Sequence, residues 1–436
     1  MSDAESSLLL PVDRVDKVTC MDLRNGSFTE ELKRLIYFAA PLAAVDLWSS
    51  LSSHRIVMCL RYGQAYGAKL YRKLGVQTYT AMFCLTLVCI PIAIIWLNIE
   101  KLLVFLSQDQ AIAHEAGRYA AWLIPGLFSY ASKITPLLIT STLVFCFHAP
   151  LCWLLVYKSG LGFLGGAVAM GLSNWLCAII LGCIMCFSSA CSETRAPLSM
   201  EIFNGVGEFF RYALPSAAMV CLEWWSFELI ILLSGLLPNP ELETSVLSSC
   251  LQTIATVSAI PIAIAAAAST RISNELGAGN SRAAHIVVYT ATFLAVMESL
   301  VVSMSLLVGR SVFGYVFSSD ERTVDYVAKM APLLSISIIL DGLQAVLAAG
   351  IARGCGWQHI GAYINLGSFY LCGIPFAATL AFWFNLEGVG LWIGIQAGAL
   401  VQNFLLGLFT GFTNWQNQVL LFPFFYVSFF MTCFYR

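Results

Sequence analysis

Long apolar runs separated by short polar links dominate the chain. Runs of about 20 apolar residues are long enough to cross a hydrocarbon core of about 30 Å. In lipid each run must be a helix, because every backbone N–H and C=O has to pair internally. The weaker runs are 35–51, which contains Asp46, and 419–435, which Pro423 interrupts. The clearer apolar stretches are 78–97, 119–157 (interrupted only by Lys133), 165–187, 213–237, 246–269, 286–308, 331–351, 364–384 and 389–410. The pattern predicts an all-α polytopic membrane protein.

One polar stretch between two such runs, TRISNELGAGNSRAA at 270–284, predicts a connecting loop with capped helix ends. The stretch recurs. A shift of 210 positions places YGAKLYRKLGVQTYTAMF over LGAGNSRAAHIVVYTATF, and seven of the seventeen positions from Gly67 to Phe83 are identical. The chain is therefore an internal duplication. Secondary transporters are commonly built this way, with the substrate site between the repeats.

The two halves differ in length. Pro41 lies 26 residues before Gly67, whereas its apparent counterpart Pro215 lies 62 residues before Gly277. The first half is thus shorter by 36 residues, about the size of one span and a link. A second, shorter gap lies around SYASKIT. The second half is expected to be complete and the first half is not.

The links between runs indicate the domains and the orientation. Under the positive-inside rule, short links that carry Lys or Arg face the cytoplasm. In the second half these links hold Arg195, Arg211, Arg271, Arg282 and Arg353. We expect a disordered cytosolic tail (1–30), an incomplete N-terminal lobe (31–187), an interlobe linker with an amphipathic segment (188–212), a complete C-terminal lobe (213–412) and an atypical apolar tail (413–436).

Composition excludes several classes of function. The chain is 59% hydrophobic and 11% charged, against about 25% charged residues in a typical soluble domain. A net charge of −2 gives no basis for binding nucleic acid. The five His are dispersed without a metal-ligand or nucleophile pattern, so we expect neither an enzyme nor a metal site. No phosphate-binding G-x-x-x-x-G-K-[ST] motif occurs, so transport would need no cofactor and would draw on an ion gradient.

Acidic residues inside apolar runs are the candidates for ion coupling. A carboxylate at the bilayer centre costs about 2.5–3.5 kcal/mol on insertion scales, which makes its presence a functional hypothesis. Glu223 and Asp341 each lie near the middle of a run, and we expect them to carry the coupling cation. A structural buried pair with Gln344 or nearby hydroxyls is the alternative. Glu298 and Glu228 are further candidates, although Glu298 could serve helix packing and Glu228 is turned about 140° from Glu223.

Aromatic residues beside the first of these acids could form walls of a substrate cavity between the lobes. Trp224, Trp225 and Phe227, with Asn365 and Tyr370, suit flat aromatic or cationic solutes through stacking and cation–π contacts. The alternative is that each of these side chains faces lipid or a neighbouring helix.

Several stretches resemble one known family. STRISNELGAGN, GQAYGAKLYRKLG, CLEWWSFELI, LLPNPELETSVLS and ARGCGWQHIGAYINLG are similar to the multidrug and toxic compound extrusion (MATE) family, above all its plant DETOXIFICATION branch. The resemblance covers roughly residues 30–415. It implies the MATE fold of two six-helix lobes with nominally twelve helices, here about ten because the N-terminal lobe lacks segments.

The resemblance also implies a function. It implies antiport of organic solutes against protons or Na⁺, with protons favoured by the plant branch, and it places an acidic pair at Glu223 and Asp341. Expected partners are small organic solutes and membrane lipid, around a monomer in the plasma or vacuolar membrane. The alternative is a truncated, non-transporting splice or gene-model variant of such a transporter.

Overall fold

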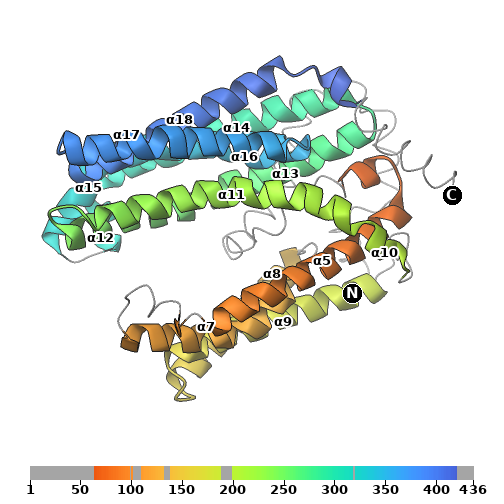
Figure 1. Ribbon diagram of the computed structural model, residues 1–436, viewed down its shortest axis with the longest axis horizontal. Helices are drawn as coiled ribbons and strands as arrows, with labels where there is room; N and C mark the ends of the chain where they lie inside the picture. The colour runs from red at the N-terminus through yellow and green to blue at the C-terminus, as the bar shows by residue number, and fades with distance from the viewer. Residues whose placement is uncertain are drawn as a thin grey trace. The chain divides into compact units, whose positions relative to one another are not determined.

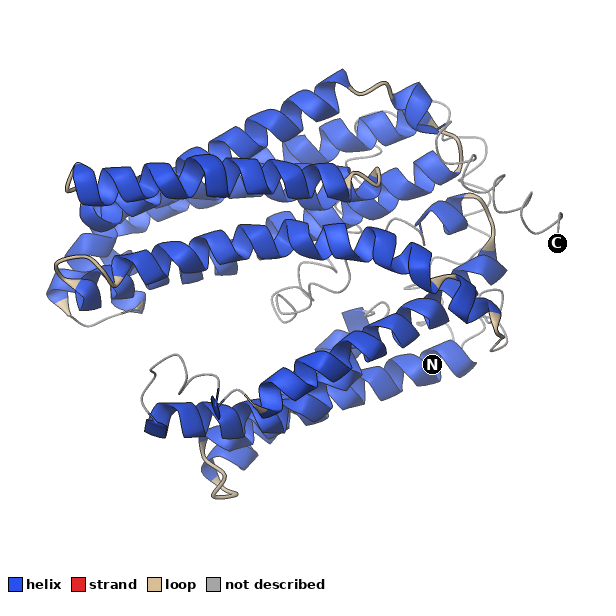
Figure 2. Ribbon diagram, in the orientation of Figure 1, coloured by secondary structure: helices blue, strands red, loops and turns tan. Residues whose placement is uncertain are grey.

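The computed structural model describes residues 63–98, 100–101, 110–131, 138–187, 199–317 and 320–419. All regular structure in this part of the chain is helical (Figure 2). Seven of its helices are long and apolar enough to cross a membrane, or eight if one bent pair counts as a span. These findings confirm the all-α membrane fold class. The tail at 1–30, the weak run 35–51 and nearly all of 419–435 lie outside the described residues.

The described residues form two compact units, Leu70–Phe210 and residues 63–69 with 211–419. In the first unit α7 and α8 both pack against α9, and α5 packs against α7 (Figure 1). The long stretch 119–157 therefore contributes to two helices. The helices of this unit are α5 (Tyr71–Leu97), α7 (Gln110–Ala131), α8 (Leu138–Tyr157), α9 (Phe163–Phe187) and the short α10 (Glu201–Asn204).

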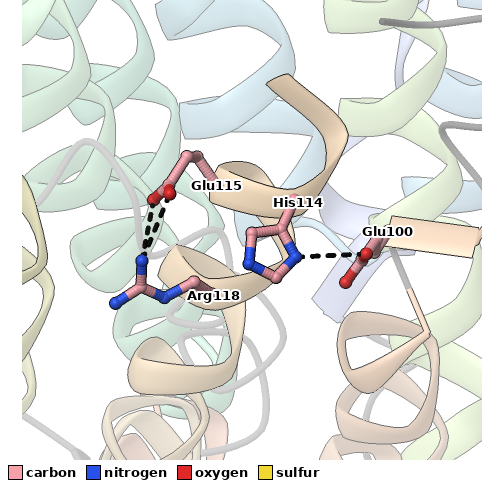
Figure 3. A network of polar contacts seen from close by, with 4 residues as sticks. All are labelled: Glu100, His114, Glu115 and Arg118. Carbon is pink, nitrogen blue, oxygen red and sulfur yellow. Dashed lines mark hydrogen bonds and ion pairs between the residues drawn. The ribbon is translucent and has the colours of Figure 1, made fainter. Parts of the chain in front are cut away.

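Polar contacts at one end of this unit fix the start of α7. His114 Nδ1 lies 3.2 Å from Glu100 Oε1, which joins α7 to the chain beyond α5 (Figure 3). One turn later Arg118 pairs with Glu115 at 3.2 Å. Both pairs are about half exposed, so each contributes about 0–1 kcal/mol to stability.

The second unit is a helical bundle in which two long helices, Glu321–Ala352 and Gln358–Trp383, contain three π-helical segments. Its core includes the largest buried side chains of the described residues, with Trp392 and Phe369 fully inside. Its elements are α11 (Val206–Ser234, which starts at the end of the first unit), α12 (Pro240–Val257), α13 (Ala259–Gly277), α14 (Ser281–Phe313), η4 (Gly314–Val316), α15 (Glu321–Gln344), η5 (Ala345–Ala352), α16 (Gln358–Asn365), η6 (Leu366–Gly373), α17 (Ile374–Ala378), η7 (Thr379–Trp383) and α18 (Glu387–Phe412).

The predicted single span 246–269 is wrong in detail, because it is divided between α12 and α13 with a bend of 43° at Ser258. Pro261 has no N–H to donate to the carbonyl of Val257 and its ring clashes with that carbonyl, which ends the first helix. The Ser258 hydroxyl donates to Ile254 O at 2.6 Å at the break. Apolar composition alone does not predict such a bend.

The predicted loop at 270–284 is also wrong in extent. Its first half continues α13 to Gly277, and α14 begins at Ser281, so only Ala278 to Asn280 make the turn. Arg271 and Glu275 stabilise the last turns of α13 through an ion pair of 2.8 Å at i,i+4 spacing. The capping part of the prediction is confirmed, since Asn280 Oδ1 accepts a hydrogen bond from Ala283 N at 3.3 Å.

The internal duplication predicted from the sequence is confirmed in the backbone. Helix α5 begins at Tyr71 and α14 at Ser281, which are 210 residues apart. Two residues before each start, Lys69 has φ 59° and its counterpart Gly279 has φ 82°. Only Gly adopts this left-handed region without a steric cost. The preceding backbone bonds also correspond, from Ala68 N to Gln64 O and from Ala278 N to Asn274 O, both at 2.9 Å.

Residues 63–67 pack against the equivalent end of α13 in a joint made of glycines. A methyl group on Gly277 would lie 2.6 Å from Gln64 O, and one on Gly67 would overlap Asn274 O. The shift of 210 converts one of these contacts into the other, since Gly67 corresponds to Gly277 and Gln64 to Asn274. The joint therefore pairs the two copies of one duplicated segment.

Helix α18 packs closely along the polypeptide that contains η6, α17 and η7. Gly390, Gly394 and Gly398 face this neighbour at four-residue spacing. A methyl group on Gly390 would lie 2.8 Å from Ala381 N, and one on Gly398 would lie 2.9 Å from Ser368 O. Small residues at this spacing let two helix backbones approach closely, as is common between membrane helices.

Candidate functional site

Two acidic residues lie near each other in the second unit. Glu223 lies on α11 and Asp341 on α15, close enough for the charge of Glu223 to act on Asp341. Gln344, one helical turn after Asp341, makes a side-chain hydrogen bond to Glu223. Asp341 Oδ2 is buried without a hydrogen-bond partner among the described residues. The structure therefore brings together the two acids that the sequence singled out.

The other two candidate acids have different surroundings. Glu298 on α14 accepts a hydrogen bond from Ser299 Oγ at 3.4 Å, and its Oε1 is buried without a partner within the described chain. A methyl group on Gly342, the residue after Asp341, would overlap Ser299 Oγ, so α14 and α15 are in close contact there. Glu298 precedes Ser299 and therefore lies next to this contact. Glu228 is exposed, on a different face of α11 from Glu223.

Two amides on α18, Gln402 and Asn403, were not predicted from the sequence as site residues. Gln402 Nε2 donates to Asn365 Oδ1 at 2.7 Å, and Asn365 Nδ2 donates to Met219 O at 2.7 Å. Asn403 Nδ2 donates to Leu340 O at 2.9 Å. Two adjacent amides in the apolar run LWIGIQAGALVQNFLLGLFTGF were the available signal, because polar side chains inside a membrane span require partners.

The five residues predicted as cavity walls occupy two kinds of place. Phe227 and Asn365 are core residues of the second unit, with 7% and 0% exposure. The Phe227 ring lies 6.4 Å from that of Trp392. Trp224 and Trp225 are exposed, and Tyr370 is partly buried against the core. Their role towards a solute stays a prediction.

Known proteins match this chain over most of its length. The MatE family profile matches residues 51–154 and 215–379. The chain belongs to the MatE family. The proteins DETOXIFICATION 12 and DETOXIFICATION 13 of Arabidopsis thaliana are 66% and 68% identical to it, over 96% of the chain and 97% of each relative. The resemblance predicted from the motifs is thereby confirmed, and the chain is a transporter rather than an enzyme.

The MATE fold is confirmed by solved structures. The crystal structure of the eukaryotic MATE transporter AtDTX14 matches with a TM-score of 0.84 and 47% identity, over 91% of this chain and 98% of that one. A crystal structure of MATE in complex with MaL6 matches with a TM-score of 0.72 at 16% identity and supports the fold alone. The chain is therefore an integral multi-pass membrane transporter of small organic compounds.

The same comparisons bear on the missing segments. The alignment with DETOXIFICATION 12 runs over 468 positions, more than the 436 residues of this chain. The relative therefore has residues without a counterpart here. Because the match still covers nearly all of both proteins, it does not favour the alternative of a truncated, non-transporting variant.

Proposed function

We propose that this MATE transporter exports organic solutes in exchange for protons and that Glu223 and Asp341 carry the exchanged proton. The observation that carries the proposal is the pairing of these two acids inside the second unit, with Asp341 Oδ2 buried and without a partner there. Two carboxylates that act on each other repel when both are ionised. Binding one proton relieves that repulsion, and releasing it restores a negative charge that favours a cationic solute.

The polar atoms around the pair support the same proposal. Buried atoms without a partner in the described helices include Glu298 Oε1, Gln402 Oε1 and Asn403 Oδ1 as well as Asp341 Oδ2. Each of these four atoms is a hydrogen-bond acceptor. A bound proton supplies a donor to one carboxyl group without requiring several ligands to converge. Na⁺ is the second candidate, since it would also be attracted to a set of oxygens.

The solutes we propose are organic cations and flat aromatic compounds, in the plasma or vacuolar membrane. Trp224 and Trp225 offer exposed rings on the acid-bearing helix α11, where a cationic or planar group could stack on them. Their rings lie next to Glu223 in the sequence, so solute and proton would act on one segment of helix.

Transport by the purified protein in proteoliposomes tests the proposal. Uptake of a fluorescent organic cation is measured with an imposed pH gradient, with a Na⁺ gradient at equal pH, and with neither. Glu223→Gln and Asp341→Asn remove the charge while keeping the shape and one acceptor oxygen. Glu321→Gln is the control, because this acid is exposed at the start of the same helix as Asp341.

We expect a pH gradient alone to drive uptake by the parent and by Glu321→Gln. Each of the other two variants should lose gradient-driven uptake while still inserting in the membrane. Uptake that follows the Na⁺ gradient would replace the proton with Na⁺ at this pair. Gradient-driven uptake that survives in both Glu223→Gln and Asp341→Asn would refute the assignment of the pair.

A further inference from the structure

We propose that the adjacent amides Gln402 and Asn403 on α18 are positioning residues that hold the two acid-bearing helices in register. This inference rests on the proposed function of Glu223 and Asp341, and it adds the residues that fix where those acids lie. Neither amide needs to touch the transported proton or the solute. Asn403 donates to the backbone of α15 directly, and Gln402 reaches the backbone of α11 through the side chain of Asn365.

The connection to Glu223 runs through Asn365. Gln402 donates to Asn365 Oδ1, which leaves the Asn365 amide nitrogen free to donate to Met219 O, both at 2.7 Å. Met219 O is the carbonyl four residues before Glu223, so in an α-helix it also accepts the Glu223 N–H. The Asn365 bond is therefore made to the helical turn that carries Glu223. Gln402, Asn365 and Met219 are all at most 1% exposed, so water does not compete for these bonds.

Packing on the same turn reinforces that connection. A methyl group on Gly361 would overlap the Met219 sulfur, so α16 presents a glycine where the Met219 side chain lies. Asn365 follows Gly361 by one helical turn on α16. Helix α11 is thus held at Met219 by its side chain and by its carbonyl oxygen, one turn before Glu223.

The connection to Asp341 is direct. Asn403 Nδ2 donates to Leu340 O at 2.9 Å, the carbonyl of the residue before Asp341. The π-helix η5 starts at Ala345, one turn after Asp341. A π-helical turn leaves the regular α-helical bonding pattern, and such turns are frequent at functional sites. An external bond to Leu340 O therefore fixes α15 just before the place where its own ladder changes.

Together these bonds connect α18 to both of the helices that carry the acids. Gln402 and Asn403 are consecutive residues. A shift of α18 along its axis, relative to α11 and α15, must therefore strain or break both connections. The distance between two interacting charges sets their repulsion. The charge of Arg353, at the end of η5, also acts on Glu223. At a given position of Arg353, the two amides would consequently set how strongly Glu223 and Asp341 compete for one proton.

The test compares variants on the same helix. Gln402→Met and Asn403→Leu each remove a donating amide, whereas Gln396→Leu is the matched control. Gln396 is also a buried amide of α18, at 8% exposure, and neither of its polar atoms has a hydrogen-bond partner among the described residues. Gln402→Leu is a second uncharged variant without the N–H donor, for use if Gln402→Met does not reach the membrane.

Two readouts separate positioning from general damage. The pH profile of solute uptake should shift by about one unit for Gln402→Met and Asn403→Leu, which corresponds to the loss of roughly one hydrogen bond. Amide hydrogen exchange should rise by about 10-fold around Glu223 for Gln402→Met and around Asp341 for Asn403→Leu. Gln396→Leu should change neither measurement.

The outcomes distinguish this inference from the proposed function. Unchanged pH profiles in both amide variants, with uptake still abolished by Glu223→Gln and Asp341→Asn, would overturn the positioning role and leave the acid pair intact. Equal effects of Gln396→Leu and Asn403→Leu would also overturn it, because helix packing alone would then explain the loss. Normal transport by Glu223→Gln and Asp341→Asn would refute the proposed function and this inference with it.

Discussion

A single methyl group on the glycine seam of α18 should weaken the second unit measurably. In Gly394→Ala the added Cβ would overlap the backbone N and Cα of Ala377 on α17. At the neighbouring Gly390 the corresponding distance to Ala381 N is 2.8 Å. An ordinary contact needs about 3.5–4.0 Å, so even Gly390 lacks about 1 Å of room. Gly394 lacks more, and the neighbouring backbone cannot rotate away as a flexible side chain could.

The magnitude follows from two opposing effects. Overpacking a well-packed site costs about 1–3 kcal/mol, and a clash with backbone belongs at the upper end. Replacing Gly by Ala inside a helix returns about 1 kcal/mol of helix propensity. The net loss should be about 2 kcal/mol, which corresponds to a fall of about 4–8 °C in the unfolding temperature of a unit of this size.

Thermal unfolding in detergent, followed by fluorescence-detected size exclusion, measures this loss. Gly407→Ala is the control on the same helix, since a methyl group there would have nothing within 4 Å. We expect the control to match or slightly exceed the parent. If Gly394→Ala were as stable as Gly407→Ala, the seam would not be close-packed and the reasoning would be wrong.

Three further substitutions test local features by the same unfolding assay. Lys69→Gly should raise stability by up to about 1 kcal/mol, because Gly adopts the φ of 59° without a steric cost. An unchanged or lower unfolding temperature would count against a strained turn at Lys69. Tyr326→Phe should cost about 1–3 kcal/mol, since it removes the 2.8 Å hydrogen bond to the buried Glu243 carboxyl group. No loss would show that this carboxyl group does not need Tyr326 as a donor. Asp320→Ala should lower stability near neutral pH, because the Thr323 hydroxyl and amide that donate to Asp320 lower the pKa of its carboxyl group. That contribution to stability is present above the carboxyl's unfolded pKa and is lost as the pH falls through the lower folded value. The difference in stability between parent and variant should therefore disappear in acid, and a difference that does not depend on pH would contradict this reasoning.

The sequence predicted most of the fold because lipid imposes a simple rule on it. The length of the apolar runs alone located the long helices. The repeat located the equivalent turns that precede α5 and α14. The prediction failed where polarity was taken to mean a loop. Arg271 and Glu275 are good helix formers at i,i+4 spacing, so α13 continues through them to Gly277. It also failed at Ser258, because a bent and a straight apolar helix have the same composition.

The candidate site was predicted only in part, for a different reason. Glu223 and Asp341 stand out as charges in apolar runs, and any reader of the sequence finds them. Their partners do not stand out, because Gln402 and Asn365 are separated by 37 residues and Asn365 and Met219 by 146. Which amide meets which carbonyl depends on how four helices are rotated against one another, and hydrophobic periodicity does not fix that rotation. The same rotation places Phe227 and Asn365 in the core of the second unit.

The glycine joint between residues 63–67 and the end of α13 has the form of an interface between identical partners. Gly67 contacts Asn274, and Gly277 contacts Gln64. The shift of 210 positions turns the first contact into the second, so the two copies use the same pair of positions on each other. Such reciprocity is what a two-fold axis imposes on a homodimer. In this chain both copies belong to one polypeptide, so the pairing no longer depends on how much protein the cell makes. Each copy is also free to change alone, and the turn already shows this, with Lys at position 69 where its counterpart keeps Gly279.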